Sequence, residues 1–110
     1  MQTIDRQHLR KLMAREPRLN IVEVLDSDDF DQGHLPGAIN IPLSDDFETK
    51  AKQAVPNQTK TLVVYCQNED CDASPKAASR LEAAGYENVY DYEGGKDDWS
   101  EAGLKLHGAP

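Results

Sequence analysis

A stretch near the middle of the chain places a cysteine between a strand and a helix. The apolar run 62–65 (LVVY) has the length and the β-branched and aromatic side chains of a buried strand, and it ends at Cys66. After a polar loop, Ser74 and Pro75 fit the N-cap and first position of a helix that the Ala-rich segment 76–84 continues. Loops at this edge of α/β sheets bind ligands, and a helix N-terminus stabilises anions. Cys66 is therefore the first candidate for a reactive group.

The rest of the chain alternates strand-length apolar runs with helical segments. The patterns predict strands at 20–25, 38–41, 62–65 and 86–92. They predict helices at 44–54, capped by Ser44, at 76–84 and at 96–102. Two more helical segments are a first helix capped by Thr3 or Asp5 and ending near Glu16, and a single turn after Ser27. Crossovers of this length suit parallel pairing. We expect an α/β fold, a small parallel sheet with helices on both faces, forming a single domain over residues 1–110.

Composition and charge narrow the environment and the partners. The net charge of −8 and the pI near 4.7 argue against nucleic-acid or anionic-membrane partners, because phosphate binding needs a basic surface. No apolar run has the length of a membrane span, and residues 1–6 lack a signal-peptide layout, so we expect a cytoplasmic protein. In a reducing compartment, Cys66 and Cys71 are expected to be active thiols, and their spacing matches no zinc site.

Two further segments resemble the signatures of the rhodanese-like family. Residues 30–42 (FDQGHLPGAINIP) look like its amino-terminal signature. The carboxyl-terminal signature is matched by 85–95 (GYENVYDYEGG) with Trp99, Ala102 and Gly103. With Tyr65 and Cys66 between them, the resemblance covers nearly the whole chain. It implies a rhodanese-like α/β domain whose loop cysteine accepts a sulfane sulfur as a persulfide.

The resemblance implies a sulfurtransferase. Cys66 would take sulfur from thiosulfate or a persulfide and pass it to a thiol or cyanide. The persulfide would lie in a cradle of loop backbone N–H groups, from Gln67, Asn68, Glu69, Asp70, Cys71 and Asp72. Amides at a helix start can stabilise the terminal negative charge without a metal. We therefore expect no metal and no cofactor, and as partner a small sulfur compound or a protein bearing a thiol or persulfide; the oligomeric state is left open.

The loop departs from simple members of the family. It is about two residues longer, Glu69 stands where glycine would be expected, and Cys71 or Asp72 stands where arginine would be. The charges of Glu69, Asp70 and Asp72 oppose both the approach of thiosulfate and the ionisation of the thiol. We expect poor use of thiosulfate. The acid at position 72, where related phosphatases and arsenate reductases have a cationic clamp, argues against those activities.

The role of Cys71 leaves alternatives open. It either acts as a resolving thiol that forms a disulfide with an oxidised or persulfidated Cys66, or packs under the loop. A disulfide requires Cα atoms about 4.4–6.8 Å apart. Two alternatives to sulfur transfer stand beside it, and the acidic loop that lacks glycine and arginine favours the first. One is a non-catalytic rhodanese-like binding or regulatory module, and the other is a dithiol redox protein using Cys66 and Cys71.

Other residues of the motifs are interpreted as structural. His34 is expected to fix its loop by hydrogen bonding rather than to act as a base. The pair Gly94 and Gly95 is expected to permit close approach of the backbone near the loop that follows Cys66. At Glu23 to Leu25, many members have Asp-Val-Arg, so a structural ion pair with that arginine is missing. Trp99 is expected in the core.

Overall fold

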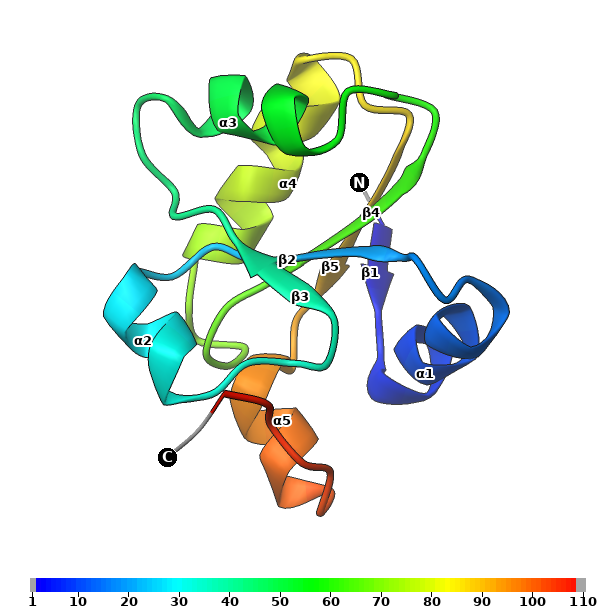
Figure 1. Ribbon diagram of the computed structural model, residues 1–110, viewed down its shortest axis with the longest axis vertical. Helices are drawn as coiled ribbons and strands as arrows, with labels where there is room; N and C mark the ends of the chain where they lie inside the picture. The colour runs from blue at the N-terminus through cyan, green and yellow to red at the C-terminus, as the bar shows by residue number, and fades with distance from the viewer. Residues whose placement is uncertain (1, 109–110) are drawn as a thin grey trace.

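Residues 2–108 of the computed structural model form a five-stranded parallel sheet with helices around it (Figure 1). The strands are β1 Gln2–Ile4, β2 Asn20–Glu23, β3 Ala38–Asn40, β4 Thr61–Tyr65 and β5 Asn88–Tyr92. The helices are α1 Arg6–Arg15, α2 Ser27–Gln32, α3 Phe47–Ala54, α4 Ala73–Ala83 and α5 Gly95–Glu101. The strand order is β1-β5-β4-β2-β3, and every neighbouring pair is parallel. The predicted α/β class and parallel sheet are confirmed.

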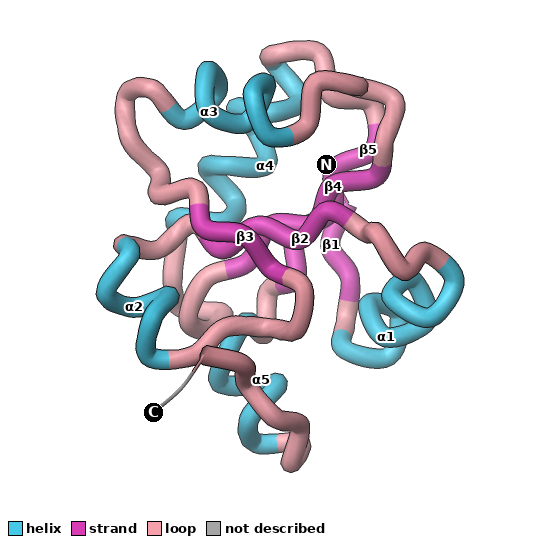
Figure 2. Tube along the Cα trace, in the orientation of Figure 1, coloured by secondary structure: helices cyan, strands magenta, loops and turns pink. Residues whose placement is uncertain are grey.

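Helices cover both faces of the sheet, as predicted, and each face has its own apolar core. Along β4, Leu62 and Val64 point to one face while Val63 and Tyr65 point to the other, which is the period of a strand. The first face packs against α3 and α4, and the second packs against α1 and α5, where Trp99 is buried. Figures 1 and 2 show these two helix pairs on opposite sides of the strands.

The edge strand β1 is the element that the sequence patterns missed. Its three residues pair with β5, with Ile4 opposite Tyr92. Three residues are too few to show alternation, so nothing in the local pattern distinguishes them from a helix cap. Asp5 is the cap of α1, because its side chain accepts a hydrogen bond of 2.9 Å from the His8 N–H. Thr3, the alternative cap, lies in β1 instead.

The serine caps predicted for the other helices are wrong. The residues at the N-caps of α2, α3 and α4 are Asp26, Asp46 and Asp72, in place of Ser27, Ser44 and Ser74. None of these three aspartates makes a side-chain cap hydrogen bond. Helix α4 thus begins at Ala73, and Ser74 lies inside its first turn, buried with 2% of its surface exposed. The strands β2, β3 and β5 are one or two residues shorter than predicted, and α5 begins one residue earlier, at Gly95.

The C-terminal segment returns across the second face. His34 and His107 form an antiparallel bridge, with N–H to carbonyl distances of 2.9 and 2.8 Å. The indole N–H of Trp99 donates to the carbonyl of Lys105 at 3.2 Å, and Leu106 packs against the second core. These contacts attach the chain after α5 to the loop that follows α2.

Candidate active site

Cys66 directly follows β4 at the carboxyl edge of the sheet, where the sequence places it. Its side chain is 1% exposed and belongs to the core shared with α3 and α4. The Ser74 Oγ atom lies 3.4 Å from Cys66 Sγ, and the carbonyl oxygen of Cys71 lies 3.7 Å from it. The sulfur is therefore covered by the loop and by the first turn of α4.

The structure joins Cys66 and Cys71 by a disulfide. Their Cα atoms are 6.4 Å apart, within the range of about 4.4–6.8 Å that a bridge requires. Cys71 is half-buried and also packs against the core shared with α3 and α4. Cys71 thus both forms the disulfide and packs under the loop, which the sequence left as alternatives. Its role as a resolving thiol stays a prediction.

The residues predicted as a backbone cradle, 67–72, form a compact turn over the sulfur. The Asp70 N–H donates to Asn68 Oδ1 at 3.0 Å, and the Cys71 N–H donates to the Asn68 carbonyl at 3.1 Å. These two amides are therefore engaged within the turn while the disulfide is closed. Cradling a persulfide with these two amides would require both hydrogen bonds to break. The cradle stays a prediction.

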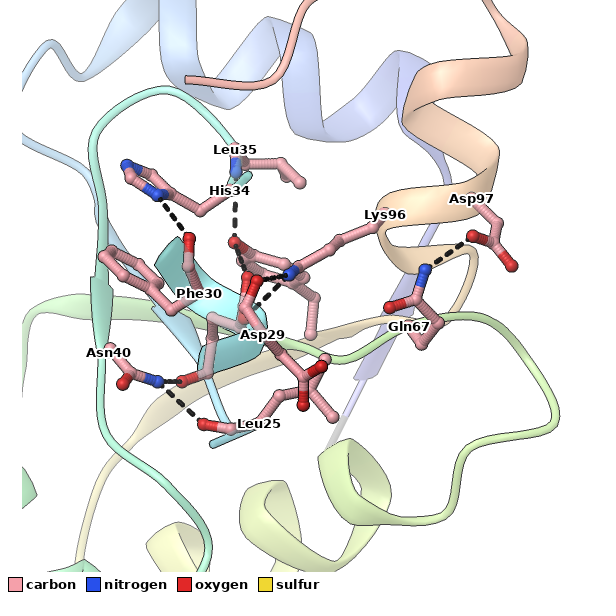
Figure 3. A network of polar contacts seen from close by, with 11 residues as sticks. Leu25, Asp29, Phe30, His34, Leu35, Asn40, Gln67, Lys96 and Asp97 are labelled. Atoms are coloured by element: carbon pink, nitrogen blue, oxygen red, sulfur yellow. Dashed lines mark hydrogen bonds and ion pairs between the residues drawn. The ribbon is translucent and has the colours of Figure 1, made fainter. Parts of the chain in front are cut away.

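The first turn of α5 holds the base of this loop. The Lys96 N–H donates to the Cys66 carbonyl at 3.1 Å, and the Asp97 N–H donates to the Gln67 carbonyl at 2.9 Å. The Asp97 carboxylate also accepts from Gln67 Nε2 at 2.6 Å (Figure 3). It accepts a second hydrogen bond, from Asn68 Nδ2, at 2.9 Å. The hydrogen bond from Asn68 has the larger effect on the pKa of Asp97, and together with the one from Gln67 it lowers that pKa. Backbone and side chain together tie the loop to α5.

Gly95 permits this close approach, as predicted for the glycine pair. Its φ angle is +63°, in the left-handed region that favours glycine. A Cβ atom at this position would lie 2.8 Å from the carbonyl carbon of Gln67 and would also overlap the Cys66 carbonyl oxygen. A side chain at Gly95 is therefore incompatible with the observed contact between α5 and the loop.

A buried ion pair behind the loop was missed by sequence reasoning. Lys96 Nζ lies 2.9 Å from Glu23 Oε2, with the two side chains 6% and 0% exposed. Tyr65 donates its hydroxyl to Glu23 Oε1 at 2.9 Å and accepts the Leu35 N–H at 3.1 Å. Lys96 Nζ also donates to the Asp29 carbonyl at 2.7 Å, and Figure 3 shows it reaching into this network. Burial and the Glu23 charge raise the pKa of Tyr65 far above its usual value, which keeps the phenol neutral.

The Glu23–Lys96 pair replaces the ion pair with a motif arginine that the sequence suggested was missing. Glu23 has Lys96 as its cation, while Leu25 packs on the other face. The available signal was an acid inside an apolar strand, since a buried carboxylate needs a cation or donors. Lys96 has a double role, because its side chain pairs with β2 and its N–H holds Cys66.

A model of the rhodanese-like domain matches residues 5–102. The chain belongs to the rhodanese-like family. It is 31% identical to the thiosulfate sulfurtransferase GlpE of Shewanella oneidensis, covering 82% of this chain and 84% of that protein. It is 34% identical to an HTH-type transcriptional regulator of Mycobacterium tuberculosis over 93% of this chain, but spans only 43% of the regulator. A human single-domain sulfurtransferase has a similar structure, with a TM-score of 0.78, 27% identity, and coverage of 92% of this chain and 96% of that one.

His34 of the rhodanese-like signature has loop-fixing contacts. Its ring stacks on Phe30 with 3.8 Å between centroids, and its Nδ1 lies 3.1 Å from the Phe30 carbonyl oxygen. Its backbone pairs with His107, whose own side chain is exposed. These contacts lie within the loop after α2, in agreement with the structural role expected for His34.

Asp91 places a second buried carboxyl in the rhodanese-like domain, and sequence reasoning missed it too. It lies on β5 opposite Val64 and is 1% exposed. Its Oδ1 atom has no hydrogen-bond partner among residues 2–108. Burial raises the pKa of Asp91, a hydrogen bond with Ser74 partly offsets this, and the charge of Glu93 raises it further. The alternation of β5 contained a signal, because Asp91 shares its face with the buried Val89.

An open cleft of about 610 Å³ adjoins the tip of the loop. Glu69 lines it from the loop, together with the start of α1 and the segment after β5. Acids outnumber bases in its lining, and the one arginine there, Arg6, is paired with Asp98 at 2.9 Å. Residues 2–108 contain no cluster of three or more His, Cys, Asp or Glu side chains suited to a metal ion. No helix in that range is long and apolar enough to cross a bilayer.

Proposed function

We propose that this rhodanese-like chain is a sulfurtransferase that carries a sulfane sulfur on Cys66. The observation that carries the proposal is the position of Cys66, directly after β4 and at the start of the loop that leads into α4. Family membership and the sulfurtransferase names of two relatives support the same chemistry. The identities of the sulfur donor, a persulfide, and of the acceptor, a thiol, are part of the same proposal.

The reaction needs two displacements at sulfur. First, the Cys66 thiolate attacks the sulfane sulfur of a persulfide, forms the Cys66 persulfide and releases the donor as a thiolate. Second, an acceptor thiolate attacks the outer sulfur, which leaves with the acceptor, and Cys66 returns as a thiolate. No electrons are gained or lost over the cycle, and no cofactor is required.

The charge of the loop favours a persulfide over thiosulfate as the donor. Glu69, Asp70 and Asp72 are all exposed on the loop. The nearby lysines are already paired, because Lys76 lies 3.0 Å from Asp72 and Lys96 is buried against Glu23. A dianion such as thiosulfate therefore meets negative charge that neither of these two lysines is free to offset. The reacting group of a persulfide carries at most one negative charge, whereas thiosulfate carries two.

The disulfide favours a second candidate, in which Cys71 takes part. The Cys71 thiolate would attack the inner sulfur of the Cys66 persulfide, form the Cys66–Cys71 disulfide and release hydrosulfide. A dithiol reductant would then return both cysteines to thiols and leave as a disulfide. This cycle suits a reducing compartment such as the cytoplasm, where thiols reopen the loop.

Intact mass of the reduced protein tests the proposal. Wild type, Cys66→Ser and Cys71→Ser are incubated separately with thiosulfate and with a small persulfide. We expect a gain of about 32 Da per sulfur atom with the persulfide, reversed by cyanide and absent from Cys66→Ser. Retention of the adduct by Cys71→Ser, with its loss from wild type as hydrosulfide appears, would select the second candidate. No adduct in any Cys66-containing protein would overturn sulfur transfer.

A further inference from the structure

The loop after Cys66 lies between an acidic cleft and an apolar groove. On the side of β1 and β5 is the open cleft of about 610 Å³ to which Glu69 contributes. On the side of β2 and β3, a groove of about 440 Å³ runs along the first turns of α4. Its lining consists of Leu43, Pro75, Lys76, Ser79 and Arg80. Since β4 is the middle strand of the sheet, the loop that follows it separates the cleft from the groove.

The groove is apolar because the charged ends of its two cations are engaged elsewhere. Lys76 Nζ lies 3.0 Å from Asp72, and Arg80 Nε donates to Glu48 at 2.8 Å. The aliphatic stems of the two side chains are left to line the groove. Leu43 lies beside these stems and also packs against the core that contains the active sulfur. The groove therefore suits an apolar side chain that lies close to the reacting sulfur.

The cleft on the other side of the loop carries negative charge that its own bases leave in excess. Its charged lining consists of Asp5, Arg6, His8, Glu69, Glu93 and Asp98. Arg6 is paired with Asp98 at 2.9 Å. Within residues 2–108, no ion pair reaches Glu69 or Glu93. The loop 67–72 adds two more acids and no base, so a positive charge has to come from outside the protein.

Both the cleft and the groove persist when the disulfide opens. Of the residues that line them, Glu69 alone belongs to the loop 67–72. The others lie in the strands and helices or in the segments directly attached to them. A partner therefore meets the same two surfaces whether the loop is closed or open.

This arrangement favours a protein as the sulfur donor. A chain segment that crosses the loop reaches both the cleft and the groove, and a basic side chain on it offsets the acids near Cys66. We propose that the donor is a protein whose persulfidated cysteine lies between a basic and an apolar residue. The apolar side chain occupies the groove, and the basic one lies against Glu69 and Glu93. The Cys66 thiolate attacks the outer sulfur of the persulfide, and the partner's cysteine leaves as a thiolate.

The inference rests on the proposed sulfur transfer by Cys66 and names its donor. The probe is a synthetic peptide whose persulfidated cysteine has two arginines on one side and two leucines on the other, made in both orders. Comparison peptides have glutamates in place of the arginines or serines in place of the leucines, and cysteine persulfide is the small donor. Transfer to the reduced protein is followed as the rate of mass gain.

Neutralising the cleft tests the charge. The double variant Glu69→Gln with Glu93→Gln removes two exposed acids from the cleft. Its matched control is Glu16→Gln with Glu87→Gln, which removes two exposed acids that line neither the cleft nor the groove. We expect the arginine peptide to react about tenfold faster than the glutamate peptide at low salt. The cleft variant should lose most of this difference, and the control should keep it.

Changing the groove tests the apolar contact. Leu43→Ser should slow transfer from the leucine peptide about fivefold and remove the difference between the leucine and serine peptides. Ser79→Gln narrows the groove from an exposed position of α4, so it should act in the same direction without altering the core. Thermal unfolding of both variants shows that the fold is kept.

Equal rates for the arginine and glutamate peptides, or rates that the cleft and groove variants leave unchanged, would overturn the inference. A leucine–arginine peptide no faster than cysteine persulfide would overturn the protein donor. Docking is also measured without transfer, by fluorescence anisotropy of the same peptide with serine in place of cysteine, bound to Cys66→Ser. Absence of a mass gain with every persulfide would count against sulfur transfer alone, so the two proposals fail separately.

Discussion

Two buried carboxyl groups lie on opposite faces of the central sheet, and within residues 2–108 only Glu23 is paired with a cation. Glu23 is neutralised by Lys96 and accepts a hydrogen bond from Tyr65. Asp91 has a hydroxyl neighbour and an acid two residues away. The first arrangement secures the fold behind the loop. At Asp91, desolvation and the like charge of Glu93 disfavour the charged form of the carboxyl group. The two acids should therefore respond to substitution in opposite directions.

Replacing Asp91 by asparagine should stabilise the protein at neutral pH. Because burial raises the folded-state pKa of Asp91, folding becomes less favourable as pH rises from the unfolded pKa through the folded one. Asp91→Asn should raise the free energy of unfolding at neutral pH and leave it unchanged below about pH 4. Urea unfolding at both pH values measures this. A variant less stable than wild type at neutral pH contradicts the prediction.

Replacing Lys96 by methionine should be strongly destabilising. The substitution leaves Glu23 buried without its cation, while the backbone N–H that holds Cys66 remains. Removing one partner of a buried pair costs about 3–5 kcal/mol. The double variant Lys96→Met with Glu23→Gln should recover much of the loss, because no buried charge is left. Chemical denaturation of the three proteins checks this, and equal losses in single and double variants would argue against an ion-pair origin.

The single residues differ in how far the sequence predicts them. The position of Cys66 follows from a local pattern, a buried strand that stops at a polar loop, and the close approach at Gly95 follows from a motif. Lys96 has no comparable local signal, and the alternation of β5 marks Asp91 as buried without indicating its partner. Their partners Glu23 and Ser74 lie far away in the sequence, so the fold has to bring them together before either contact exists.

At the scale of elements, the contact between α5 and the active loop decides where Cys66 lies. Gly95→Ala should cost more than about 2 kcal/mol of stability, because a Cβ atom would overlap the backbone of Cys66 and Gln67. Gly103→Ala is the matched control. It also has a positive φ, +81°, but a Cβ there meets nothing within 4 Å, so only the backbone strain of about 1 kcal/mol remains. Thermal unfolding compares the two, and equal losses would contradict the steric argument.

The side-chain clamp from α5 should slow the opening of the disulfide loop. Asp97→Ala removes the acceptor for Gln67 and Asn68, so reduction by a phosphine should become a few-fold to about tenfold faster. Because those donors lower the pKa of Asp97, the clamp is complete above about pH 4 and is lost as pH falls through the lowered pKa. The ratio of variant to wild-type rates should therefore approach one in acid. Glu101→Ala, an exposed acid of the same helix, should behave as wild type.

Element boundaries show what local patterns leave out. The helices exist where amphipathic spacing predicts them, yet α4 begins before Ser74 because that hydroxyl turns toward Cys66 instead of capping. The strand β1 is too short for a pattern and exists through its pairing with β5. Both differences arise from tertiary contacts that override a local preference.

At the scale of the whole molecule, the excess of acids should make stability sensitive to salt. The net charge of −8 is spread over a domain with a radius of gyration of 12.6 Å, and its self-repulsion opposes the compact state. Salt also weakens exposed pairs such as Lys76 with Asp72, but solvent already screens these pairs, so they contribute little to stability. Raising sodium chloride from about 0.01 to 0.3 M should raise Tm by a few degrees. Potassium chloride should act equally, and a fall in Tm would contradict net repulsion.

The architecture as a whole was the most predictable level. Alternating strand and helix patterns suffice for a parallel sheet covered on both faces, since few other arrangements bury all the apolar segments. The order of the strands does not follow from those patterns. It depends on which apolar faces meet, and contacts such as Tyr65 with Glu23 arise between strands that are distant in the sequence.

The attachment of Cys66 and Gln67 to α5 limits how far a change at the sulfur can spread. Their carbonyls are held by backbone N–H groups that do not take part in the chemistry. Opening the disulfide should therefore alter amide hydrogen exchange and NMR chemical shifts mainly at residues 67–73, while the protected sheet amides stay unchanged. A partner that distinguishes the oxidised from the reduced protein would then have to recognise this short tip, and the rest of its contact surface would be the same in both states.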